Sequence, residues 1–189
     1  MSERWRCFVA VPIGPDLSAA LRTAVERWRS RPDLEGLRWT DPDAWHLTLA
    51  FIGAVEADTV DTLRATLAGV ASTSEPLTLT TGGVGGFPSA RQGRVAWYGV
   101  ADPDSALHAL ARRVRERLGL DPAAPFRGHV TLGRAKRDPV DLRAWRDSAS
   151  APAGTMEVRT LQLMRSHLGR GPARYELIES AALQAAARV

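Results

Sequence analysis

One short pattern, a histidine followed two positions later by a threonine, occurs twice in this chain of 189 residues. The copies read His-Leu-Thr-Leu at 46–49 and His-Val-Thr-Leu at 129–132. Side chains of a strand alternate between its two faces, so the histidine and threonine of each copy share one surface. The apolar residues between them face the other way, toward a core. The pattern therefore predicts two strands, each with an imidazole beside a hydroxyl.

The sequence around the two copies also repeats. A strand, a helix and a His/Thr strand are expected at 6–11, 16–29 and 45–52, and again at 94–100, 104–118 and 129–134. The strands do not alternate strictly with helices, which favours antiparallel or mixed sheets. We predict an α+β fold with two pseudo-symmetric lobes in a single domain, 1–189. Each lobe is a largely antiparallel sheet with helices on its outer face, and one His/Thr pair lies on each wall of a central groove.

The remaining elements are less regular. Apolar spacing predicts a helix at 57–70, a modest helical stretch within 137–154, a short strand at 38–39, and strands at 77–81, 156–168 and 174–182. The segment 82–93 holds five glycines and is expected to be a loop that turns sharply or passes close to another part of the chain.

Composition sets broad limits. The chain is 44% hydrophobic and 24% charged, which is typical of a globular protein. Its apolar runs are too short to cross a bilayer, and its first residues lack a secretory signal, so we expect a soluble cytoplasmic protein without membrane contact. Cys7 is the only cysteine and is expected to be a buried, inert thiol. The basic residues are arginines except for Lys136, a bias that suits phosphate binding but would not by itself indicate it.

Two imidazoles on facing walls suit the transfer of two protons across a phosphate. Histidine serves as acid or base near neutral pH because its ordinary pKa is about 6.5. A metal hydrolase is disfavoured, since no carboxylate or third histidine stands at ligand spacing from either motif.

In these features the chain resembles the two-histidine phosphoesterases, and among them the RNA 2′,3′-cyclic phosphodiesterases, also called 2′-5′ RNA ligases. The resemblance runs from Arg6 to about Leu183. Its carriers are the segments 6–11, 38–39, 45–53, 86–89 with Arg91, 94–97, 126–134 and 166–168, followed by Gly171 and Tyr175. One departure is Gly128, which stands where the family usually has a proline before the second histidine.

The resemblance implies hydrolysis of a 2′,3′-cyclic phosphate at an RNA end to a 2′-phosphate, without metal or cofactor. It makes His46 the proton donor to the leaving oxygen and His129 the acceptor from water, although the residues alone do not decide between the two roles. Thr48 and Thr131 would hold the non-bridging phosphate oxygens. Run backwards, the same site would join a 5′-hydroxyl to the cyclic phosphate in a 2′-5′ link.

Further substrate contacts are expected from family positions. Arg134 matches a family arginine near the phosphate, and guanidinium fits phosphate well. Ser166 and Tyr175 match positions near the groove, with strand packing as the alternative. Arg91 is a candidate contact to the RNA backbone, with simple solvent exposure as the alternative. By strict alternation Phe51 falls in the core. His108 and His167 have no partner at useful spacing.

Two other functions stay open at this point. A two-histidine phosphoesterase could act on small nucleotide cyclic phosphates or 2′-5′ oligonucleotides rather than on RNA ends. A catalytically silent RNA-binding module would use the basic groove alone, but binding needs no matched pair of proton carriers. The expected partner is RNA with a 2′,3′-cyclic phosphate end. No heptad or large apolar stripe appears, and we expect a monomer.

Overall fold

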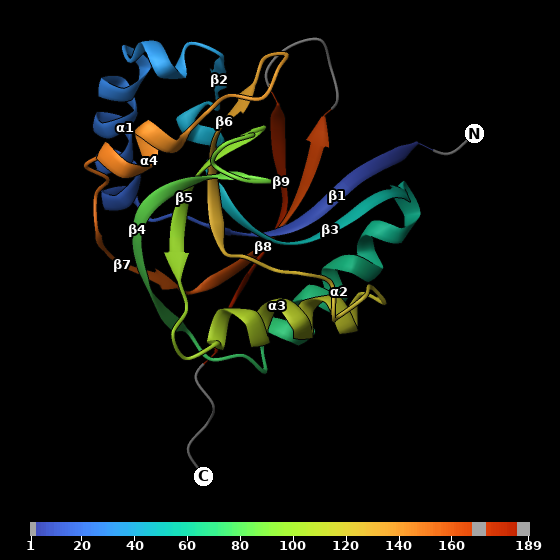
Figure 1. Cartoon of the computed structure of the whole chain (residues 1–189). Helices are drawn as coiled ribbons and strands as arrows, with labels where there is room; N and C mark the ends of the chain where they lie inside the picture. Colours follow the sequence, from blue (N-terminus) through green and yellow to red (C-terminus); the bar gives the residue numbers. More distant parts are fainter. Residues whose placement is uncertain (1–2, 168–172, 185–189) are drawn as a thin grey trace.

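The computed structural model describes residues 3–167 and 173–184. Within them, nine strands form one sheet in which every pairing is antiparallel, in the order β7-β4-β5-β6-β3-β1-β8-β9, with β2 paired to β6 (Figure 1). The strands are β1 Arg4–Pro12, β2 Leu37–Trp39, β3 His46–Glu56, β4 Leu77–Phe87, β5 Val95–Ala101, β6 His129–Ala135, β7 Gly154–Val158, β8 Thr160–His167 and β9 Arg174–Ala182. The helices are α1 Pro15–Arg29, α2 Val60–Ala71, α3 Ala106–Arg117 and α4 Arg143–Ser148, with 3-10 turns at Pro32–Leu34, Pro42–Ala44 and Ala57–Thr59.

The sheet consists of two halves that meet at the two histidine strands. One half holds β3, β1, β8 and β9, and the other holds β6, β5, β4, β7 and β2. Among the described residues, the register pairs the two halves only at Leu47 of β3 and Val130 of β6. This arrangement confirms the predicted α+β fold with antiparallel sheets. The two expected lobes are the two halves of one curled sheet, joined at a narrow seam.

The helices of the repeated unit cross between the halves. Helix α1 follows β1, yet it shares an apolar core with β5 and β6 of the other half. Helix α3 follows β5 and shares its core with α2 and with β1, β3 and β8 of the other half, as well as with β4 and β7 of its own half. The core-facing residues are Leu21, Ala24, Val25 and Trp28 of α1, and Leu107, Leu110, Ala111 and Val114 of α3. Burying each large apolar side chain contributes roughly 1.5–3 kcal/mol, so the crossing ties the halves together.

Glycine lets strand β4 run farther than the sequence suggested. The predicted strand 77–81 continues to Phe87, and half of the expected 82–93 loop is therefore strand. A Cβ on Gly85 would lie 2.3 Å from the Trp97 ring, and one on Gly86 would lie 2.7 Å from Leu142. Close approach to another part of the chain, one of the two alternatives expected for this segment, is therefore confirmed at Gly85 and Gly86. Gly128 packs in the same way, since a Cβ there would lie 2.8 Å from Leu107.

Two other boundaries differ from the expectation. Strand β3 continues beyond Gly53 to Glu56. The single strand expected at 156–168 is two strands, β7 and β8, that separate at Arg159. Leu168 and Gly171, which carried part of the family resemblance, lie outside the described residues.

No helix among the described residues is both long and apolar enough to cross a bilayer. The side chain of Cys7 is buried, as predicted, and burial raises the pKa of its thiol.

Candidate active site

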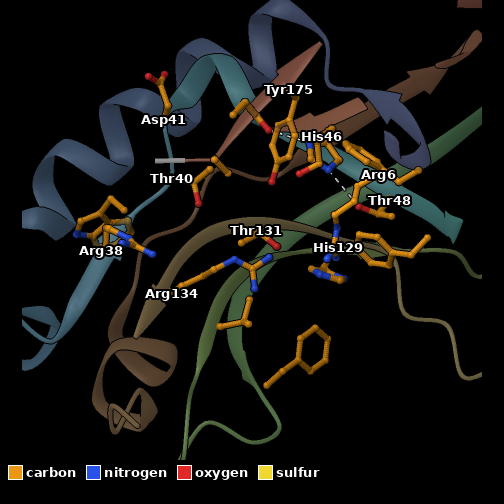
Figure 2. Close-up of a pocket in the computed structure, with 18 of the residues that line it drawn as sticks. Arg6, Arg38, Thr40, Asp41, His46, Thr48, His129, Thr131, Arg134 and Tyr175 are labelled. Atoms are coloured by element: carbon orange, nitrogen blue, oxygen red, sulfur yellow. Dashed lines mark hydrogen bonds between the residues drawn. The ribbon is translucent and has the colours of Figure 1, made fainter. Parts of the chain in front are cut away.

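A cavity of about 460 Å³ lies on the face of the sheet that carries the histidines (Figure 2). His46 and Thr48 line it from β3, and His129 and Thr131 line it from β6. The remaining lining residues are Arg6, Cys7, Phe8, Arg38, Trp39, Thr40, Asp41, Ala44, Phe51, Gly53, Phe87, Val95, Arg134, Ser166, Ala173 and Tyr175. The two motifs, which are far apart in the sequence, therefore share one cavity at the seam between the halves.

Both imidazoles are held in the same way. The Nδ1 atom of His46 lies 2.8 Å from the carbonyl oxygen of Ala44, and that of His129 lies 2.8 Å from the carbonyl oxygen of Arg127. A carbonyl oxygen can only accept, so Nδ1 carries the hydrogen in each ring. Nε2 is then the atom that exchanges a proton in both histidines. In His46 this atom also lies 3.1 Å from the hydroxyl of Thr48.

Aromatic rings fix the planes of the imidazoles. Phe8 and Tyr175 pack against His46, with ring centroids 4.9 and 5.1 Å away. Phe87 packs edge-on against His129 at 4.9 Å. These contacts come from strands on both sides of the seam and leave each ring little freedom to rotate.

Burial and nearby positive charge disfavour the protonated form of both histidines. Burial lowers the pKa of His46 below its ordinary 6.5, and the nearby charges of His129 and Arg134 lower it further. Burial likewise lowers the pKa of His129, aided by the charges of Arg134 and Arg127. In each case the carbonyl that accepts from Nδ1 acts in the opposite direction. A bound anion would offset the positive charges and raise both pKa values, so the site is poised to gain a proton when a phosphate enters.

A bulge brings Arg134 into the cavity. By strict alternation, a residue five positions after His129 would face the core. The register between β5 and β6 changes from Trp97–Thr131 to Ala96–Gly133, which leaves Leu132 without a direct partner on β5. Leu132 and Gly133 are both buried, and Arg134 returns to the cavity face, which it lines.

The same device corrects the prediction for Phe51. The register between β1 and β3 changes from Ala10–Thr48 to Val9–Ala50, so Leu49 has no direct partner. Leu49 and Ala50 both enter the core, and Phe51 turns outward. Its side chain is 72% exposed and lines the cavity, whereas alternation placed it in the core.

The other predicted contacts divide into two groups. Ser166 and Tyr175 face each other across β8 and β9, and both line the cavity. Arg91 is exposed and is not among the lining residues. Arg91 lies near Asp141 instead. Hydrogen bonds from Arg143 are the main cause that lowers the pKa of Asp141 to about 2, and the charge of Arg91 adds to this effect.

Several lining residues had no role assigned from the sequence. The sequence indicates Arg6, Arg38 and Trp39 only as parts of expected strands and as carriers of the family resemblance. Their place in the cavity depends on β2 pairing with β6 and β1 with β8, which spacing along the chain does not reveal. A usable signal was the position of Arg38 and Trp39 shortly before the first motif.

The remaining histidines have partners that the sequence did not indicate. His108 contacts Asp102 at 2.8 Å through Nδ1 and the carbonyl oxygen of Phe126 at 3.2 Å through Nε2. His167 lies 2.8 Å from the carboxylate of Glu176. Among the described residues, no group of three or more His, Cys, Asp or Glu side chains is arranged to hold a metal ion.

An all-antiparallel curled sheet with two His-x-Thr motifs facing one cavity defines a two-histidine type of phosphoesterase site. The family model for the 2′-5′ RNA ligase superfamily matches residues 15–170, and the chain belongs to this family.

Two of the relatives match over nearly their whole length. The chain is 31% identical over 172 residues to the RNA 2′,3′-cyclic phosphodiesterase of Archaeoglobus fulgidus, covering 88% of this chain and 94% of that protein. It is 30% identical over 192 residues to the protein of the same name from Escherichia coli, covering 97% and 99%. Among solved structures, E. coli LigT without ligand aligns with a TM-score of 0.73 and 29% identity, over 97% of this chain and all of that one. LigT complexed with 3′-AMP aligns with a TM-score of 0.72.

Proposed function

We propose that this chain hydrolyses RNA 2′,3′-cyclic phosphate ends to 2′-phosphomonoesters by acid–base catalysis with two histidines. The observation that carries the proposal is a pair of histidines on two walls of one cavity. In each, Nδ1 donates to a backbone carbonyl, so that Nε2 is left to exchange a proton. Relatives about 30% identical over most of the chain are RNA 2′,3′-cyclic phosphodiesterases. Hydrolysis of a cyclic phosphate is therefore the activity that the fold, the site and the family favour together.

In the proposed reaction, His129 Nε2 accepts a proton from water as the water oxygen forms a bond to phosphorus. The bond from phosphorus to the ribose 3′-oxygen breaks, and His46 Nε2–H gives its proton to that oxygen. The product is a 2′-phosphate with a free 3′-hydroxyl. The histidines end with exchanged protonation states and return to the start by exchange with solvent.

Three other side chains would stabilise the charge that develops on the phosphate. Thr48 and Thr131 lie on the same strand faces as the histidines and can donate to the non-bridging oxygens. Arg134, brought in by its bulge, can donate two parallel hydrogen bonds to them. The reverse reaction would replace water by a 5′-hydroxyl and form a 2′-5′ link.

A second candidate is hydrolysis of small nucleotide cyclic phosphates or 2′-5′ oligonucleotides. The size of the cavity favours it, because about 460 Å³ lies within the range of sites for a single small molecule. The two candidates share the chemistry and differ only in how much of a chain is bound beyond the terminal nucleotide.

The direct test is to incubate the purified protein with an oligonucleotide that ends in a 2′,3′-cyclic phosphate and to identify the product. Formation of the 2′-phosphomonoester is expected. Recovery of the intact cyclic phosphate, with the oligonucleotide bound, would favour the RNA-binding module instead. We also propose that the protein acts as a monomer and that Ser166 and Tyr175 contact the terminal nucleoside.

A further inference from the structure

Two arginines lie directly opposite each other on neighbouring strands. Arg38 of β2 pairs in register with Arg134 of β6. Residues opposite each other on antiparallel strands project from the same side of the sheet, and both of these line the cavity. Figure 2 shows Arg134 between Arg38 and His129, so that Arg38 lies farther from the histidines along the cavity.

This pairing is unfavourable unless an anion lies near it. Like charges directly opposite on a sheet repel, and each strand pair normally avoids them. Arginines elsewhere on the surface, such as Arg143, Arg146 and Arg159, form ion pairs with a nearby carboxylate. In the part of the chain that the structure describes, neither Arg38 nor Arg134 makes such a pair.

The one carboxylate among the lining residues does not relieve the repulsion. Asp41 accepts a hydrogen bond from the backbone N–H of Asp43 at 3.0 Å, and its side chain points away from Arg38 in Figure 2. Strand β2 is also held firmly, because the N–H of Thr40 donates to the carbonyl oxygen of Leu132 at 2.8 Å. Arg38 and Arg134 therefore lie opposite each other on firmly paired strands, and within the described residues neither forms an ion pair with a carboxylate.

A single bound phosphate does not neutralise the two positive charges of Arg38 and Arg134. The scissile phosphate lies between the histidines in the proposed reaction and engages Arg134, and Arg38 stands beyond it. In an RNA chain the next phosphate is one nucleotide away, on the 5′ side of the terminal ribose. We propose that Arg38 binds this internucleotide phosphate, so that the site selects the end of an RNA chain over a cyclic mononucleotide. The inference rests on the proposed function.

The test compares two dinucleotides that both end in a 2′,3′-cyclic phosphate. One has an ordinary internucleotide phosphate, and the other has an uncharged methylphosphonate at the same linkage. The wild-type protein is expected to show a kcat/KM about tenfold higher for the charged substrate, the size of one exposed charge-assisted contact. Arg38→Gln should bring the ratio of the two kcat/KM values close to one.

Arg29→Gln is the matched control, because Arg29 is exposed at the end of α1 and does not line the cavity. It should keep the wild-type ratio. Arg38→Gln should also melt no lower than wild type without ligand, because it removes a repulsion. A ratio unchanged by Arg38→Gln would overturn the proposal. If kcat/KM fell equally on both substrates, Arg38 would instead act at the scissile phosphate.

Binding measurements separate this proposal from the reaction itself. The same dinucleotide pair, ending in a stable 2′-phosphate, can be titrated into wild type and Arg38→Gln by calorimetry. If the protein turned over no cyclic phosphate, the proposed function would fail, while a loss of preference in Arg38→Gln would still support the subsite. Equal affinity of wild type for the charged and uncharged dinucleotides would reject the subsite even in an active enzyme.

Discussion

Phe51 and Arg134 occupy equivalent positions in the two halves of the sheet, each five residues after a motif histidine. In both strands a bulge follows the threonine, buries two successive residues, and turns the fifth residue onto the cavity face. The repeat therefore extends beyond the motif to a local distortion of the backbone. One half uses the position for an aromatic ring and the other for a cation, so a symmetric frame holds an asymmetric site.

Replacing Phe51 should affect binding more than folding. The side chain is 72% exposed, so Phe51→Ala should change the free energy of unfolding by less than about 0.5 kcal/mol. Its ring faces the cavity and can stack on a base, so KM for a cyclic-phosphate oligonucleotide should rise about fivefold or more. Steady-state kinetics and urea titration measure the two effects. A Phe51→Tyr variant should behave as wild type, and unchanged KM in Phe51→Ala would exclude stacking.

Removal of either motif histidine should abolish turnover. His46→Ala and His129→Ala are each expected to lower kcat on a cyclic-phosphate RNA end by about 10³-fold, the usual range for loss of a general acid or base. A 3′-deoxyribonucleoside 2′-(p-nitrophenyl) phosphate separates the roles, because it keeps the 2′ ester and its nitrophenolate leaves without a proton. Under our assignment His46→Ala regains activity on this substrate and His129→Ala does not. The reverse pattern would exchange the roles.

The pH profile should reflect the lowered pKa values of both histidines. The acid must be protonated in the free enzyme, and burial holds the pKa of each ring below 6.5. The alkaline limb of kcat/KM should therefore have its midpoint below 6.5, with activity falling as pH rises through it. Arg134→Gln removes a positive charge that acts on both rings, which should raise their pKa values and move the limb to higher pH. An unmoved limb would show that Arg134 does not act on the titrating groups.

Chelation should leave the activity unchanged. Two imidazoles supply both proton transfers in the proposed reaction, so no step needs a metal-bound water. The rate should be the same within error before and after dialysis against EDTA. Loss of activity that zinc or another divalent cation restores would favour a metal mechanism.

A methyl group on Gly85 should disturb the His129 wall. The added Cβ would lie 2.3–2.9 Å from three atoms of the Trp97 ring, which is only 7% exposed and cannot flex away. Trp97 contacts Phe87, which in turn packs on His129. Gly85→Ala should cost about 1–3 kcal/mol in unfolding free energy. Gly154→Ala, which meets nothing within 4 Å, is the control and should unfold like wild type.

The sequence was sufficient for the parts of the fold that follow from regular periodicity. Alternation around His46 and His129 predicted the two strands and their polar face, and helical spacing predicted the helix now seen as α1. It was insufficient wherever the backbone departs from the period. The bulges after Thr48 and Thr131 move the side chains that follow to the opposite face of the strand, and no residue type in the sequence indicates these bulges. Cross-strand register, which joins Arg38 to Arg134, depends on contacts between segments distant in the chain.

The exchange of helices between the two sheet halves has a mechanical consequence. A fragment ending between the halves would expose the apolar stripe of α1 and lose the cover of its own strands at the same time. Separation of the two walls would thus expose both apolar cores to solvent together. The distance between the facing imidazoles is therefore maintained by the cooperative folding of both halves rather than by the single residue pair at the seam.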